Sequence, residues 1–130
     1  MAKQFTLGKN ERLKSRKSIE QLFSEGKKFK VEPYRVHYLF NKQRTPSLQF
    51  GAGVSTKNFK GAVDRNRIKR LTKEAWRVQK IILQKKLKEK GSGLNVFIIY
   101  TGKEPPGYKE VYSKMTIILN KLEKMLDEVT

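Results

Sequence analysis

The chain has 130 residues, of which 30 are lysine or arginine and only 12 are aspartate or glutamate, so its formal net charge is +18. This length suits one domain and leaves no room for a second catalytic domain, while 37% hydrophobic residues are enough to form a core. The absence of cysteine and the presence of a single histidine exclude disulfides, thiolate zinc sites and histidine-based metal cages. Such a charge repels itself in a compact protein unless a polyanion neutralises it, which points to a nucleic acid as partner.

We expect a single RNA-binding domain over residues 1–130, with residues 1–14 as a flexible basic arm, because these first residues have no sustained hydrophobic period. Arg12 and Lys14 are candidate phosphate contacts in this arm. An anionic membrane surface would also attract the chain, but no stretch approaches the ~20 apolar residues that span a bilayer, and no signal peptide is visible. The sequence therefore predicts a soluble, cytoplasmic protein without a membrane partner.

The first regular elements are predicted from residue 15 to residue 54. Ile19, Leu22 and Phe23 have helical spacing, with Ser15 as a possible N-cap and Gly26 as the end of the helix. Residues 29–40 are expected to be extended. Alternation in this run places Tyr34, Val36 and Tyr38 on one face and Arg35 and His37 on the other. Residues 48–54 form the next predicted strand, which we expect to pair with the first as an antiparallel hairpin.

A long helix is predicted from about residue 63 to residue 90. Its apolar stripe, with a 3,4,3,4 spacing, consists of Ile68, Leu71, Ala75, Val78 and Ile82. The opposite or flanking side carries Asn66, Lys69, Arg70, Lys73, Arg77 and Lys80. From residue 64 to residue 90 there are eleven basic and three acidic residues, so one face of the helix is cationic. Trp76 lies between the two faces and is predicted to pack, with RNA stacking as the alternative.

Arg65, Asn66 and Arg67 fall in the first turn of this helix, where the helix dipole disfavours each cation by ~0.3–1 kcal/mol. A bound phosphate would offset that cost, because exposed N-terminal amides and guanidinium groups together form an anion site. Asp64 is expected to be the N-cap. The alternative is an ordinary solvated, lysine-rich surface helix, but adjacent planar donors at the start of a helix favour contact with an RNA backbone.

The last part of the chain is predicted to be structural. The segment GSG ends the long helix, residues 95–100 (NVFIIY) form a buried strand, and Pro105 and Pro106 keep the following loop irregular. A final helix begins near residue 109. It has a broad apolar stripe and four positive against four negative charges, so the net excess of +18 lies before it.

The run AVDRNRIKRLTKEAWR resembles the signature of the bacterial ribonuclease P protein subunit. RLKSRKSIEQLFSEGK is similar to the first helix of that family, and FGAGVSTK is similar to its strand before the signature. The resemblance implies an α/β fold of the α+β sandwich type. This fold has a short N-terminal helix, a mostly antiparallel sheet of about four strands, the long basic helix in a left-handed βαβ crossover and a C-terminal helix.

The resemblance also implies two RNA-binding surfaces and no catalytic residue in the protein. The surface facing the catalytic RNA would consist of Arg65, Asn66, Arg67, Lys69, Arg70 and Lys73. A cleft for the single-stranded 5′ leader of precursor tRNA would include Phe23, Arg35 and His37, with Arg12, Arg16 and Lys17 at its rim. Rings within a cationic groove suit single-stranded RNA, since bases stack on them. A core role for Phe23 and a plain surface position for His37 remain the alternatives.

The resemblance further implies that the RNA carries out Mg²⁺-dependent cleavage, with Mg²⁺ held mainly by the RNA and no obligate protein partner. The carboxylates of the chain support this view, because most are scattered among lysines or lie in the final helix, where they do not form a general acid/base or two-metal site. A ribosomal-type structural RNA-binding protein is the alternative. A sequence-specific DNA-binding protein ranks last, because the long helix does not follow a tight turn.

Overall fold

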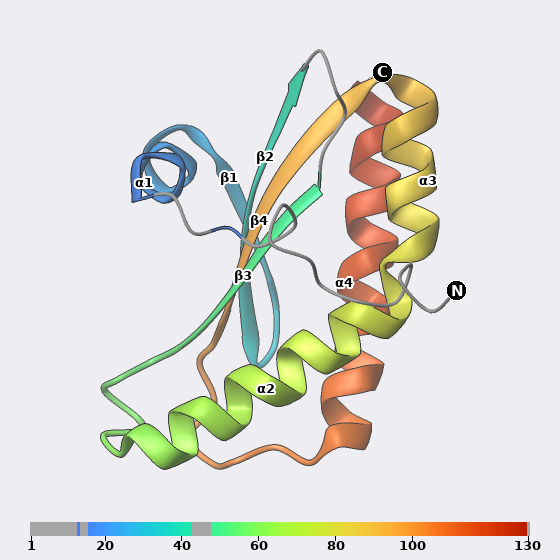
Figure 1. Ribbon diagram of the computed structural model, residues 1–130. Helices are drawn as coiled ribbons and strands as arrows, with labels where there is room; N and C mark the ends of the chain where they lie inside the picture. The colour runs from blue at the N-terminus through green and yellow to red at the C-terminus, as the bar shows by residue number, and fades with distance from the viewer. Residues whose placement is uncertain (1–12, 14–15, 43–47, 130) are drawn as a thin grey trace.

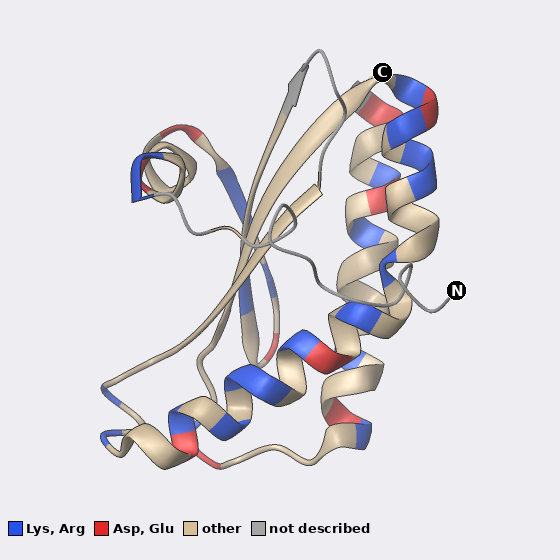
Figure 2. Cartoon of the chain, viewed as in Figure 1, with Lys and Arg blue, Asp and Glu red and all other residues tan. Residues whose placement is uncertain are grey.

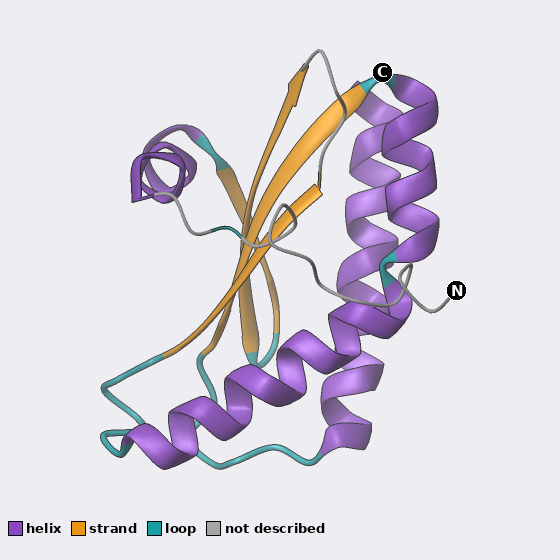
Figure 3. Ribbon diagram, viewed as in Figure 1, coloured by secondary structure: helices purple, strands orange, loops and turns teal. Residues whose placement is uncertain are grey.

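The computed structural model describes residues 13, 16–42 and 48–129 (Figures 1 and 3). The elements in chain order are α1 (Arg16–Glu25), β1 (Lys27–Val31), β2 (Tyr34–Lys42), β3 (Leu48–Val54), α2 (Ala62–Gln79), α3 (Ile81–Lys90), β4 (Ser92–Tyr100) and α4 (Tyr108–Val129). Within the described ranges, no helix is long and apolar enough to cross a membrane.

The four strands form one mixed sheet in the order β1-β2-β4-β3. β1 with β2 and β2 with β4 are antiparallel, whereas β3 and β4 are parallel and are connected through α2 and α3. Helix α1 lies on one face of the sheet, and α2, α3 and α4 lie on the other (Figure 1). The expected α+β architecture is confirmed, including the basic helix between two parallel strands.

The predicted hairpin between residues 29–40 and 48–54 is wrong. The first run contains a turn at Glu32–Pro33, so β1 folds back on β2 and pairs Phe29 with Val36. Pro33 has no N–H for a strand ladder, and this ends β1. The other edge of β2 pairs with β4, so β3 cannot pair with β2 and instead joins the sheet on the far side of β4.

The predicted helix over residues 63–90 is also divided. Lys80 separates α2 from α3, although backbone hydrogen bonds continue on both sides of it, from Lys80 N–H to Trp76 O (2.9 Å) and from Gln84 N–H to Lys80 O (2.9 Å). Figure 1 shows that α3 turns away from α2 at this point and runs beside α4.

This bend changes which side chains reach the core. Ile82, predicted to be in the apolar stripe, is 61% exposed, whereas Leu83 and Leu87 are buried. Lys80, predicted to be on the cationic side, is only 1% exposed. A straight 3.6-residue period cannot predict these positions, because the bend shifts the buried face of α3 relative to that of α2.

The core lies between the sheet and helices α2, α3 and α4. Trp76 is fully buried and stacks on Phe50 of β3 at 4.4 Å between ring centroids, which confirms its predicted packing role. Helix α4 contributes a fully buried stripe of Val111, Met115, Ile118, Leu122 and Leu126. Burial of each such side chain stabilises the fold by about 1.5–3 kcal/mol.

Ion pairs connect α3 to α4. Lys86 lies 3.5 Å from Glu123, and Lys90 lies 3.4 Å from Asp127. Acidic residues of α4 therefore offset part of the charge of α3, which leaves α2 as the more cationic of the two.

Candidate nucleic-acid interface

Helix α2 begins at Ala62, with Gly61 as its N-cap in an extended conformation and without a side-chain cap. The predicted N-cap, Asp64, lies instead within the first turn. Its carboxylate still stands at the favourable end of the helix dipole. The capping prediction failed because Asp64 follows two residues that are already helical.

The loop between β3 and α2 is tied to the rest of the protein by two side chains. The Nη1 atom of Arg65 donates to Phe59 O (2.9 Å) and to Lys60 O, so this half-buried arginine holds the loop that precedes its own helix. The Nδ2 atom of Asn58 donates to Thr101 O (3.0 Å) and to the next carbonyl, on the loop between β4 and α4. The start of α2 therefore has a fixed position relative to the sheet.

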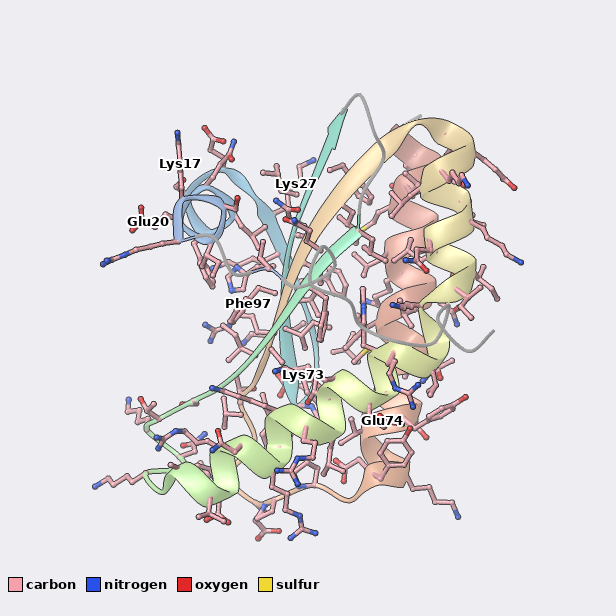
Figure 4. All side chains as sticks on the ribbon, in the orientation of Figure 1. Lys17, Glu20, Lys27, Lys73, Glu74 and Phe97 are labelled. Atoms are coloured by element: carbon pink, nitrogen blue, oxygen red, sulfur yellow. The ribbon has the colours of Figure 1, made fainter. Side chains whose placement is uncertain are left out.

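The exposed face of α2 carries cations that form no ion pair with other described residues. Asn66, Arg67, Arg70 and Lys73 are exposed, and Lys69 is half-buried. Figure 2 shows basic positions recurring along α2, and Figure 4 labels Lys73 beside Glu74. Glu74 instead pairs with Arg77 one turn further along. We call Asn66, Arg67, Lys69, Arg70 and Lys73 the α2 basic face.

A second candidate surface lies on the α1 side of the sheet. Strand pairing forms two cross-strand rows there: Lys28, His37, Phe97 and Gly51 in one, and Lys30, Arg35, Ile99 and Gly53 in the other. The cationic side chains of these rows therefore lie on the β1 side of the sheet, and the Phe97 ring and the two glycines lie on the β3 side. We call these two rows, together with Phe23 of α1, the open sheet face.

Three aromatic rings meet on the open sheet face. Phe23 is 44% exposed and packs edge-on against His37 (4.5 Å between centroids) and Phe97 (5.6 Å). Phe97 lies over Gly51 and Gly53, because a Cβ atom at either glycine would come within 3 Å of its ring. The glycines therefore leave room for the ring on this face of the sheet, and Figure 4 shows Phe97 there.

The imidazole of His37 has an unusual environment. Its Nε2 atom is buried and has no hydrogen-bond partner among the residues the structure describes. Burial lowers the pKa of His37 below its ordinary value, and the nearby charges of Arg35 and Lys28 lower it further. The ring is therefore mainly neutral at pH 7. It packs against Phe23 and lies near the positive charges of Arg35 and Lys28.

The remaining predicted leader residues have different positions. Arg12 lies outside the described residues. Arg16 is exposed and pairs with Glu20 at 3.4 Å, a contact that adds little stability at such exposure. Lys17 is exposed, and Figure 4 shows it on the side of α1 away from the sheet.

Sequence reasoning missed Phe97, Lys28 and Lys30 as candidate site residues. Phe97 and Ile99 alternate with buried residues in β4, so a signal existed, but the run NVFIIY was interpreted as fully buried. The lysines belong to β1, which was not separated from β2. No group of three or more His, Asp or Glu side chains that could hold a metal occurs in residues 13, 16–42 and 48–129.

Comparison with known proteins gives consistent results. Residues 7–123 match the family model described as Ribonuclease P. The chain is 38% identical over 112 residues to the ribonuclease P protein component of Porphyromonas gingivalis, covering 85% of this chain and 82% of the relative. It is 31% identical over 136 residues to that of Chlorobium phaeobacteroides, covering 96% and 92%.

Solved structures have the same fold. The RNase P protein from Thermotoga maritima superposes with a TM-score of 0.67 at 25% identity, over 85% of this chain and 96% of that one. The Staphylococcus aureus RNase P protein superposes with a TM-score of 0.67 at 20% identity, over 88% and 96%.

Proposed function

This chain belongs to the ribonuclease P protein family, as the protein component that assists removal of the 5′ leader from precursor tRNA, and we propose that its two surfaces divide the RNA contacts. It is part of a ribonucleoprotein endoribonuclease, and its partners are the ribonuclease P RNA and precursor tRNA. The observation that carries the proposal is a pair of surfaces with different chemistry, the α2 basic face and the open sheet face.

The α2 basic face is proposed to bind the catalytic RNA. Arg67, Arg70 and Lys73 have no intramolecular ion pair among the described residues, so their charges are available for phosphates. Each phosphate that they neutralise releases condensed counterions, which makes binding strong at low salt. Arg65 supports this face by holding the preceding loop.

The open sheet face is proposed to bind the single-stranded leader. Phe23, His37 and Phe97 offer rings for bases, while Lys28, Lys30 and Arg35 offer charges for phosphates. Stacking is worth ~1–3 kcal/mol per base and tolerates different sequences. That combination fits leaders whose sequences vary from one precursor to the next.

Mg²⁺ is proposed to be held mainly by the RNA. The described residues contain no group of three or more His, Asp or Glu side chains that could hold a metal. The contribution of the protein is binding: charge neutralisation, leader capture and support of the folded RNA. Because the substrate and the catalytic partner are both RNAs of the bacterial cell, we propose a cytoplasmic location.

Reconstitution tests this division. Protein and ribonuclease P RNA are mixed at low Mg²⁺, and cleavage is followed with one precursor carrying a leader of several nucleotides and another carrying one nucleotide. We expect Phe97→Leu to raise KM for the long leader about fivefold or more, since a stacked base is lost, and to leave KM for the short leader unchanged.

Lys73→Ala provides the comparison, because it should weaken assembly with the RNA equally for both substrates. If Phe97→Leu affects both precursors alike, the leader assignment is wrong. If the wild-type protein binds the RNA but does not stimulate cleavage at the mature 5′ end, the ribosomal-type alternative is favoured instead.

A further inference from the structure

The first two turns of α4 carry a pair of exposed tyrosines. Tyr108 and Tyr112 are 38% and 43% exposed, and their ring centroids are 6.1 Å apart. Val111 and Met115 on the same helix are fully buried and cover the core there. The tyrosine rings therefore lie outside the packed interior and form an exposed aromatic patch, with their planes tilted by 56° to each other.

This patch has a fixed position relative to α2. The Nε2 atom of Gln79, at the end of α2, donates to Tyr112 O (3.1 Å), and the Oε1 atom of Gln79 accepts a hydrogen bond from Thr116 Oγ1 (2.7 Å). One side chain thus connects two points of α4 to the last turn of α2. A surface held in this way loses little conformational entropy when it binds a partner.

The patch also continues the α2 basic face. Arg70, Lys73 and Arg77 follow one another at helical spacing, and Arg77 is paired with Glu74. The pKa of Tyr108 is raised first by burial and then by the charge of Glu74. Arg70 and Lys73, which form no ion pair with the part of the chain that the structure describes, are thus followed along α2 by the Glu74–Arg77 ion pair and by Gln79, which contacts Tyr112.

We propose that Tyr108 and Tyr112 form a stacking platform for an unpaired base of the catalytic RNA, next to the phosphates bound by the α2 basic face. Cations bind the RNA backbone, whereas exposed rings bind bases that have left a helix. A second copy of this chain is a poor occupant, because two chains of net charge +18 repel each other. The inference rests on the proposed function and extends its RNA surface from α2 to α4.

The test is equilibrium binding of the full chain to ribonuclease P RNA at low Mg²⁺, without precursor tRNA. We expect the double variant Tyr108→Leu and Tyr112→Leu to bind about fivefold weaker or more, the loss anticipated for one stacked base. Tyr112→Phe keeps the ring and should bind like the wild type. If the double variant does not fold, the single leucine variants are used for the same comparison.

Ile117→Ala is the matched control. Ile117 is 43% exposed, as Tyr112 is, and lies on the same helix, but five residues further on it points about 140° away. This variant should retain wild-type affinity.

Salt dependence separates stacking from charge. The leucine variants should shift the plot of log affinity against log salt concentration without changing its slope, whereas Lys73→Ala should reduce the slope by about one. Wild-type affinity in the leucine variants, or a loss of affinity equal to that of Ile117→Ala, would overturn the platform. Failure of the wild-type protein to bind the RNA would instead overturn the proposed function.

Discussion

Arg65 and Arg67 lie two positions apart at the start of α2, but their surroundings differ. Arg65 donates hydrogen bonds to the carbonyls of Phe59 and Lys60, whereas Arg67 is exposed and has no such partner among the described residues. Sequence reasoning treated both as RNA contacts. The structure shows that Arg65 also positions the loop before the helix. The RNA contacts of Arg65 and Arg67 both stay predictions.

We therefore expect Arg65→Ala to lower the free energy of unfolding by about 1–2 kcal/mol, because a hydrogen bond to a charged group contributes about 1.5–3 kcal/mol and the partial exposure of Arg65 reduces this contribution. Arg67→Ala should leave stability within about 0.5 kcal/mol of wild type and weaken RNA binding. Urea unfolding of both variants, combined with RNA titration, measures the two effects. Equal stability of the two variants would contradict the assignment.

His37 makes a prediction about pH. Its pKa in the folded state is lowered, so between the unfolded and the folded pKa the unfolded chain binds more protons. Its contribution to stability is therefore complete above about pH 6.5 and decreases as the pH falls toward the folded pKa. Thermal unfolding between pH 5 and pH 7.5 should show this decrease, and His37→Gln should reduce it. An unchanged pH profile in that variant would show that another group is responsible.

At the scale of elements, β3 has two different faces. Phe50 on one face stacks on Trp76 of α2, and Gly51 on the other lies beneath Phe97. A Cβ atom at position 51 would come 2.6 Å from the Phe97 ring, so a side chain there must displace the ring. Gly51→Val should therefore weaken leader binding while leaving the α2 basic face intact.

The measurement is affinity for a leader oligonucleotide compared with affinity for the catalytic RNA. Gly107→Ala is a suitable control, because a Cβ atom there meets nothing within 4 Å. If Gly51→Val reduces both affinities equally, the effect comes from general loss of structure.

The elements that could be predicted from sequence are those with local signals. Helix α1, the start of α2 and the stripe of α4 follow from short-range periodicity, and the alternation of Val36 and His37 predicted the two faces of β2 correctly. Strand partners could not be predicted in this way, because pairing of β2 and β3 with β4 depends on contacts between distant residues. The position of Phe97 over two glycines depends on the same pairing and was missed for the same reason.

At the scale of the whole molecule, the charge is distributed unevenly. The net excess lies before the last helix, and acidic residues of α4 pair with lysines of α3. Repulsion is therefore concentrated on surfaces that are proposed to face RNA. Surfaces that bind a polyanion destabilise the free protein and stabilise the complex.

We expect the thermal midpoint of the free protein to rise with added salt, because ions screen repulsion among its cations. Sulfate should raise it more than chloride at equal ionic strength, since sulfate also strengthens burial of apolar groups. Calorimetry in both salts tests this expectation. A midpoint that falls with added chloride would indicate that stabilising ion pairs outweigh the repulsion.

The position of β4 means that the sheet can be completed only late in the synthesis of the chain. β4 is the last strand to leave the ribosome, yet it pairs with both β2 and β3. Until it is made, β3 has no partner and α2 has no completed sheet to cover, although most of the basic residues are already present. A nascent chain without β4 therefore already carries most of the charge that attracts a polyanion, whereas the surfaces that we propose to bind RNA are complete only after β4 has been made.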